Sequence, residues 1–376
     1  MRTAVLTIVA LCLGPLLPGG PLGSTSVCGQ PAPVTDSIGR TLAEDQPGAV
    51  VLGLLHEDTT SVHAFGAIDS TGASPTAQTL FEIGSITKTF TGLLLAEQIE
   101  RGQLRPSTPV AQLLPDSVAL ARADSAGPAT MTLAHLATHR SGLPRLPSNL
   151  RAVASSRLDP YAAYGDSALY AFLDDYPLPR APGAKYEYSN LGMGLLGHLL
   201  VRRADTTYAA LVRRRVTEPL GLSDTRIHLT DGQDGRFAQG YNRVGVPTPP
   251  WHFEALAGAG ALRSTATDML AYLRAHRTAL RADADTASTL IRAMQRSLTP
   301  RAATDSESTR IGFAWHELRR DGDRILVHTG GTGGFRSFVG LDRATGRGAV
   351  VLVSTALSST RVAGAGLRLI DALRAE

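Results

Sequence analysis

A serine and a lysine three residues apart, Ser85 and Lys88, could together perform nucleophilic chemistry. The chain has two lysines, Lys88 and Lys185, among its 37 lysines and arginines. Arginine replaces lysine in most solvated roles, but it cannot lose its proton in a protein. On a helix this spacing puts both side chains on one face, and a helix N-terminus favours a developing alkoxide. We infer a serine nucleophile with a titratable amine as its partner.

A second candidate element is Tyr188-Ser189-Asn190, which precedes an apolar helical run. A phenol near cations can accept a proton and return it to a leaving group. The amide of Asn190 can bind a substrate carbonyl and the lysine. The same tripeptide also fits an ordinary helix cap.

A third candidate element is His328-Thr329-Gly330-Gly331, at the end of the apolar run 325–327. Small residues here let a substrate lie along the strand edge as an additional strand. Taken alone, the segment also fits a common exit from a strand into a turn.

The elements that must position these residues come from both ends of the chain. Strand patterns occur at 50–55, 61–67, 311–318, 324–328, 335–341 and 349–355. Helix patterns occur at 87–99, 132–138, 191–201, 208–216, 267–278 and 362–373, and 231–250 has the composition of a loop. We predict an α/β (α+β) fold, with an antiparallel sheet built from both chain ends, flanked by helices, and an inserted, mostly helical domain. The predicted sheet domain is 29–90 plus 255–376, and the helical domain is 91–254.

The first residues have the pattern of an export signal. Arg2 is followed by the apolar run 4–17 and then by glycines and serines, which predicts a signal peptide over 1–28 and a periplasmic or secreted protein. Removal of the signal takes Cys12 and leaves at most Cys28, so no internal disulfide is expected. No other apolar run reaches the length of a membrane span.

Composition argues against several function classes. The net charge is +4 and the arginine clusters lack interleaved aromatic residues, which disfavours nucleic-acid binding. His135 and His139 have metal-ligand spacing, but a helix stop follows them directly, so we expect neither a metal nor a cofactor. We expect a monomer that acts on a small-molecule substrate.

The three elements, in this order, resemble the penicillin-recognising serine hydrolases, particularly the branch of class C β-lactamases, DD-carboxypeptidases and related esterases. The resemblance covers roughly residues 40–375. It extends to the sequence segments FEIGSITKTFTG (81–92), LATHRSGLP (136–144), YSNLGMGLLG (188–197), EPLGLSDT (218–225), GAGALRSTATDML (258–270) and GGTGGFRSFVG (330–340).

The resemblance implies a role for each element. Ser85 becomes the acylated nucleophile, Lys88 helps to activate it, and Tyr188 serves as base in acylation and deacylation. Asn190 binds the side-chain amide of the substrate. The amides of Ser85 and Gly331 form the oxyanion hole.

One departure concerns His328, where many family members carry lysine. Histidine is only partly charged at neutral pH, which weakens attraction for the carboxylate of a β-lactam. The first hypothesis is therefore a hydrolase of β-lactam amides or D-alanyl peptides. The alternatives are a carboxylesterase acting on small esters at the same site and a penicillin-binding sensor that acylates without turnover.

Overall fold

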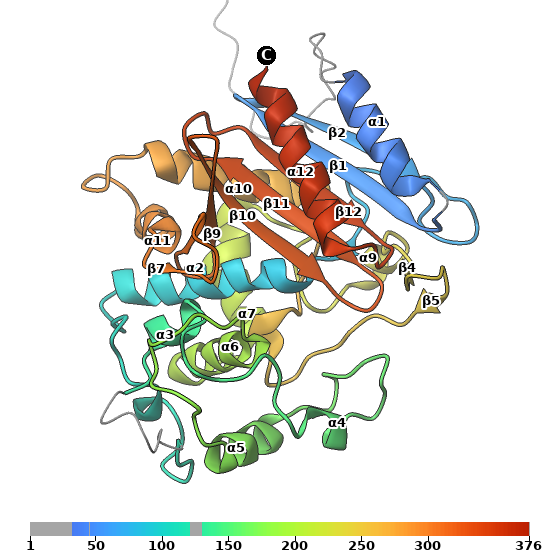
Figure 1. The fold of residues 1–376 in the computed structure, drawn as a ribbon. Helices are drawn as coiled ribbons and strands as arrows, with labels where there is room; N and C mark the ends of the chain where they lie inside the picture. The colour runs from blue at the N-terminus through green and yellow to red at the C-terminus, as the bar shows by residue number, and fades with distance from the viewer. Residues whose placement is uncertain (1–31, 45, 121–129, 376) are drawn as a thin grey trace, which may run out of the picture.

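The computed structural model describes residues 32–44, 46–120 and 130–375 (Figure 1). The predicted signal peptide and both cysteines lie outside the described residues. Within these ranges, no helix combines the length and the apolar character needed to cross a bilayer.

The main sheet has eight strands in the order β2-β1-β12-β11-β10-β9-β8-β7, and each neighbouring pair is antiparallel. The two ends of the chain meet where β1 pairs with β12, with Val50 opposite Val353. This confirms the predicted antiparallel sheet from both chain ends. The strands are β1 (Ala49–His56), β2 (Thr59–Gly66), β7 (Ala302–Ala303), β8 (Thr309–Ile311), β9 (His316–Arg320), β10 (Asp323–Gly331), β11 (Arg336–Asp342) and β12 (Gly348–Val353).

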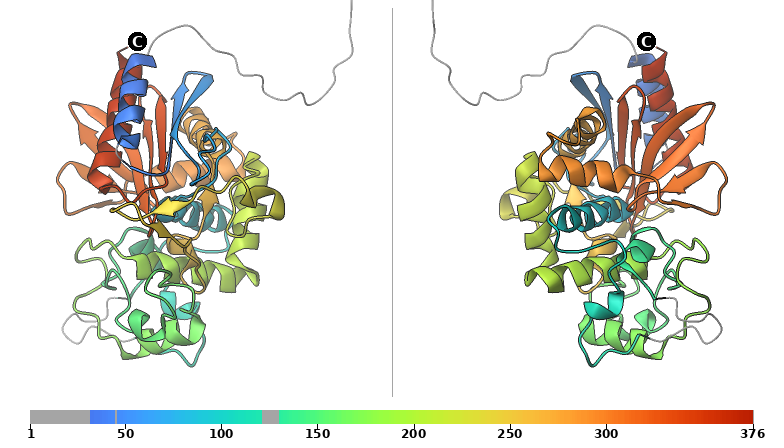
Figure 2. Two further views of the ribbon diagram at one scale, coloured as in Figure 1. Left: turned by 90° about the vertical axis from the view of Figure 1, so that its right-hand side faces the viewer. Right: turned by 90° about the vertical axis from the view of Figure 1, so that its left-hand side faces the viewer.

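Helices cover both faces of this sheet (Figure 1, Figure 2). On one face lie α1 (Ala32–Ala43) and α12 (Ser359–Arg374), and on the other lie α10 (Ala266–Arg281), α11 (Thr289–Leu298) and α2 (Thr87–Glu100). Because side chains alternate along a strand, Val50 and Leu52 pack with the core on the α1 and α12 side. Val51 and Leu55 pack on the opposite side, in the core that includes α2 and α10. Burial of each such side chain contributes about 1.5–3 kcal/mol.

The remaining helices follow α2 in the chain, and α4 and α5 lie beyond one end of the sheet, farthest from its strands (Figure 1). The division into two domains at 90 and 255 stays a prediction. These elements are α3 (Leu133–Ala137), α4 (Leu150–Val153), α5 (Asp166–Asp175), α6 (Asn190–Ala204), α7 (Tyr208–Val212), the π-helical turn Arg213–Thr217, α8 (Glu218–Leu220) and α9 (Asp231–Asp234).

The predicted strand at 311–318 is wrong in one respect, because a turn divides it into β8 and β9. The Gly312 amide donates to the Trp315 carbonyl at 2.8 Å, and Ala314 has a φ of 68°. Phe313 and Trp315 are buried in the core beside α2. The alternation of these apolar residues is typical of a strand. In the structure, however, a turn directs both side chains into the core.

The sequence patterns also missed some elements. The unpredicted helices α1, α5 and α11 each have one apolar face that packs on the rest of the protein. The region predicted as loop at 231–250 contains α9 and a small sheet of β4 (Gly240–Tyr241) and β5 (Pro247–Thr248).

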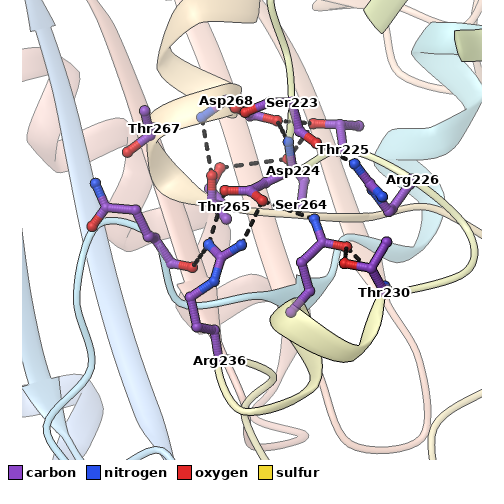
Figure 3. Close-up of polar contacts among 12 residues, drawn as sticks. Ser223, Asp224, Thr225, Arg226, Thr230, Arg236, Ser264, Thr265, Thr267 and Asp268 are labelled. Atoms are coloured by element: carbon purple, nitrogen blue, oxygen red, sulfur yellow. Dashed lines mark hydrogen bonds and ion pairs between the residues drawn. The ribbon is translucent and has the colours of Figure 1, made fainter. Parts of the chain in front are cut away.

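A polar network fixes the strand that leads to the candidate nucleophile (Figure 3). Asp224 binds both terminal nitrogens of Arg236, at 2.6 and 2.9 Å. Asp268 accepts from the Asp224 amide at 2.9 Å and from the Thr225 hydroxyl at 2.7 Å. Thr225 also contacts the hydroxyl of Ser264 at 2.8 Å. Ser264 belongs to β6 (Arg263–Ser264), which pairs with β3 (Phe81–Glu82), so the network holds the segment that enters residues 84–86.

Candidate active site

Ser85 lies in a short 3₁₀ helix of one turn, Gly84–Ile86, which leads directly into α2. Gly84 has a φ of 49°, and a Cβ atom there would lie 2.6 Å from the backbone nitrogen of Gly331. Only glycine permits both this left-handed conformation and this approach. The turn therefore brings the serine against the end of β10.

Lys88 lies one helical turn further on and is fully buried. Its Nζ donates to the Ser85 Oγ at 2.8 Å and to the Ala259 carbonyl at 2.7 Å. Burial lowers the pKa of Lys88 well below its ordinary value, and the charge of Arg145 acts in the same direction. A neutral amine, which has a free lone pair, is thereby favoured at a distance where the serine hydroxyl can donate to it.

Tyr188 lies just before α6, and its ring is brought beside the same lysine. The Nζ of Lys88 lies 5.1 Å from the centre of the Tyr188 ring. Burial raises the pKa of Tyr188 to about 12, although a hydrogen bond with Ser85 and the charge of Arg145 oppose the rise. The phenol therefore keeps its proton in the resting site at neutral pH.

The helix that begins at Asn190 is capped by the residue before it. The Ser189 hydroxyl accepts from the Gly192 amide at 2.8 Å and donates to the Pro144 carbonyl at 2.6 Å. The Asn190 side chain donates to the Tyr161 hydroxyl at 3.3 Å rather than to Lys88. Its Oδ1 is buried and has no hydrogen-bond partner among the described residues. This oxygen is available to a donor on a bound molecule.

The glycines of the third element bring β10 close to the candidate serine. A Cβ atom on Gly330 would lie 2.0 Å from the Ile83 carbonyl oxygen. The Ser337 hydroxyl, on the neighbouring strand β11, donates to that same oxygen at 2.9 Å. Gly331 follows at the end of β10, beside the turn that carries Ser85, so the Ser85 and Gly331 amides come from two segments in contact.

The side chain of His328 is buried rather than exposed to solvent. Its Nδ1 lies 2.8 Å from the Thr329 carbonyl, and its ring centre lies 5.5 Å from that of His316 on β9. Burial lowers the pKa of His328 well below its ordinary value, and the nearby His316 and Lys88 act in the same direction. The imidazole is therefore neutral at physiological pH, and the partial charge expected from the sequence is not available.

The sequence patterns did not assign His139 to the site. Its Nδ1 accepts from the Ser189 amide at 3.1 Å, and its ring centre lies 4.4 Å from that of Tyr188. Tyr186 and His316 lie beside it and share a hydrogen bond of 3.0 Å. The segment around His139 belonged to the family resemblance, but its contact with Tyr188 crosses about fifty residues of sequence. Within the described ranges, no group of three or more His, Cys, Asp or Glu side chains is arranged to hold a metal ion.

An aromatic cluster next to Asn190 was also missed. The rings of Tyr161 and Phe253 stack with centres 4.6 Å apart, and Trp251 lies 5.4 Å from Tyr161. Their positions, 161 and 251–253, are far apart in the sequence and fall in stretches without a regular pattern. Only the folded chain brings them together.

The geometry defines a serine-nucleophile site, in which a hydroxyl can pass its proton to an amine or a phenol. Comparisons with known proteins agree. The family model described as Beta-lactamase matches residues 35–373, and the chain belongs to this family.

Individual relatives are moderately similar. A β-lactamase of Escherichia coli (strain K12) is 30% identical over 67% of this chain and 64% of its own length. The D-alanyl-D-alanine-carboxypeptidase/endopeptidase AmpH of the same organism is 26% identical over 74% of this chain and 72% of its own length. The crystal structure of a class C β-lactamase from Rhodobacter sphaeroides has a TM-score of 0.74 at 26% identity, covering 91% of this chain and 98% of that one. The chain thus spans slightly less than two thirds of the first of these relatives.

Proposed function

We propose that this chain is a serine hydrolase of the β-lactamase type, which opens β-lactam amides or cleaves D-alanyl peptides through an acyl-enzyme at Ser85. The observation that carries the proposal is the 2.8 Å contact between the Ser85 Oγ and the Nζ of the buried Lys88. The named relatives, a β-lactamase and a DD-carboxypeptidase, support the same two substrate classes. The apolar segment at the start of the chain supports export.

In the first half of the reaction, the Ser85 oxygen attacks the carbonyl carbon while its proton passes to the Lys88 amine. Tyr188, hydrogen-bonded to the same serine, relays the proton to the leaving nitrogen as the bond to carbon breaks. The amides of Ser85 and Gly331 stabilise the negative oxygen of the tetrahedral state. Asn190 holds the side-chain amide of the substrate.

In the second half, water replaces the leaving group and attacks the ester. Tyr188 and Lys88 together accept a proton from the water and return it to the Ser85 oxygen when the acid product departs. Neither group has to be charged at the start, which agrees with the directions of their pKa shifts. The cycle therefore ends with the same protonation state in which it began.

A substrate panel tests this proposal. Rates should be measured on nitrocefin, a D-Ala-D-Ala peptide and a p-nitrophenyl ester, with Ser85→Ala as the matched inactive variant. We expect turnover of nitrocefin or the peptide that Ser85→Ala loses. Turnover of the ester alone would identify an esterase, and a persistent adduct without turnover would identify a sensor. Wild-type rates in Ser85→Ala would exclude Ser85 as the nucleophile.

A further inference from the structure

The loop 142–147 is fastened to the segment that carries Tyr188 and Asn190. The Arg145 carbonyl accepts from the amides of Asn190 and Leu191, at 3.0 and 3.3 Å. The Pro144 carbonyl accepts from the Ser189 hydroxyl at 2.6 Å. The backbone of Arg145 is therefore held in a fixed position relative to the candidate catalytic tyrosine.

The guanidinium of Arg145 lies over the Tyr188 ring, with its Cζ 5.1 Å from the ring centre. Its charge also lowers the pKa of the Tyr161 hydroxyl, although burial of that phenol acts more strongly and raises it. Tyr161 is the partner of the Asn190 amide. Arg145 thus lies near both phenols that flank Asn190, on the side of the site where the acyl group of a substrate is expected.

This guanidinium is exposed, and it forms no hydrogen bond or ion pair with any residue that the structure describes. An arginine offers five N–H donors in a planar fork that matches a carboxylate. No carboxylate is among the groups that shift the pKa of Lys88, Tyr161 or Tyr188, three of the side chains on which its charge acts. Lys88, His139, His316 and His328 are neutral or cationic, and Tyr161, Tyr186 and Tyr188 are phenols. The charge of Asp305 acts to raise the pKa values of His316 and Tyr186. It is not among the groups that shift the pKa of Lys88 or Tyr188.

We propose that Arg145 is a specificity-determining residue that binds an anionic group on the acyl side chain of the substrate. This inference rests on the proposed function, because it needs an acyl group at Ser85. The position at which many members of the resembled family carry a lysine holds the buried His328. Arg145 therefore supplies a fixed positive charge beside the acyl group. The aromatic cluster of Tyr161 and Phe253 next to Asn190 suits an acyl group that also carries an aryl ring.

A pair of penicillins isolates this effect. Carbenicillin carries a carboxylate on the side-chain carbon where benzylpenicillin carries hydrogen, and both share the phenyl ring and the ring carboxylate. The readout is the ratio of kcat/KM for carbenicillin to that for benzylpenicillin. Influences of Arg145 on Tyr188 or Lys88 cancel in this ratio, because both substrates use the same catalytic groups.

We expect Arg145→Ala to lower the ratio about fivefold to tenfold, as a charge-assisted contact near the surface would. The loss should fall mainly on KM for carbenicillin. Arg145→Lys should restore part of the ratio, and added salt should lower the ratio in the wild type but not in Arg145→Ala. The control is Arg151→Ala, which removes an exposed charge from α4 and should leave the ratio unchanged within about twofold.

An equal loss on both penicillins, or an unchanged ratio, would overturn the inference while leaving the proposed function intact. If the wild type turns over neither penicillin, the same variants are compared on p-nitrophenyl valerate and mono-p-nitrophenyl glutarate, which differ by a terminal methyl or carboxylate. Lack of turnover on all four substrates would overturn the proposed function and the inference with it.

Discussion

At the scale of single residues, the two lysines of this chain differ in their exposure to solvent. Lys88 is fully buried between Ser85 and Ala259, whereas Lys185 is exposed. Burial favours the neutral amine at position 88. The spacing of Ser85 and Lys88 in the sequence was sufficient to predict this pair.

The first prediction exchanges each lysine for arginine. Lys88→Arg keeps a cationic side chain but removes the titratable amine, so kcat/KM for the preferred substrate should fall at least about a hundredfold. Lys185→Arg is the matched control and should leave the rate unchanged. Retention of more than a tenth of the activity in Lys88→Arg would show that no neutral amine is needed.

The second prediction concerns pH. Because burial lowers the pKa of Lys88, the neutral amine that accepts the serine proton should persist to pH values well below the ordinary range of lysine. The value of kcat/KM should therefore be high at neutral pH and fall on the acid side as the amine gains a proton. A pH–rate profile checks this. Activity that rises only above about pH 10, where a solvated lysine loses its proton, would contradict it.

Other residues of the site could not be predicted because their contacts are long-range. The partner of His139 is the Ser189 amide, and Arg145 approaches a ring from a separate loop. The sequence placed His328 at the end of the strand along which a substrate is expected to lie. Its burial against His316, however, depends on the pairing of β9 with β10. Sequence spacing carries no information on such burial, so the charge state of that histidine became apparent only in the fold.

At the scale of elements, close backbone contacts align the 3₁₀ turn Gly84–Ile86 with β10. The third prediction is that Gly84→Ala lowers kcat at least about tenfold, because its Cβ would meet the backbone nitrogen of Gly331 and displace an oxyanion donor. Gly364→Ala in α12 is the control, since a Cβ atom there meets nothing within 4 Å. That control should keep full activity and can gain up to about 1 kcal/mol of stability. Wild-type kcat in Gly84→Ala would contradict the proposed oxyanion hole.

The network in Figure 3 gives a fourth prediction, on stability. Hydrogen bonds from Arg236 hold the pKa of Asp224 below its usual range. A carboxyl with a lowered folded pKa stabilises the protein above its unfolded pKa, and this contribution is lost as the pH falls through the folded pKa. Arg236→Ala should therefore cost about 1–2 kcal/mol of unfolding free energy at pH 7 and less at pH 3. Urea titrations at both pH values measure this, and an equal cost at both would exclude the carboxylate as the partner that matters.

For the whole molecule, the pattern of strands at both chain ends predicted the antiparallel sheet, because β1 and β12 are apolar runs that must pair and be covered. It did not predict all eight strands, since β7 was missed and β8 and β9 were predicted as one run. The helices α1, α5 and α11 were missed because amphipathic segments with ordinary propensities gain most of their stability from tertiary packing. The break in the strand predicted at 311–318 shows the same limit. There, Phe313 and Trp315 enter the core from a turn, which local sequence does not distinguish from a strand.

The central claim is that the Ser85 hydroxyl, and no other group, becomes covalently acylated. Protein mixed with a β-lactam and acid-quenched within the first turnovers should show the mass of one added acyl group, which peptide mapping places on Ser85. The Ser85→Ala variant should show no added mass. An adduct on another residue, or hydrolysis that continues in Ser85→Ala, would contradict the account.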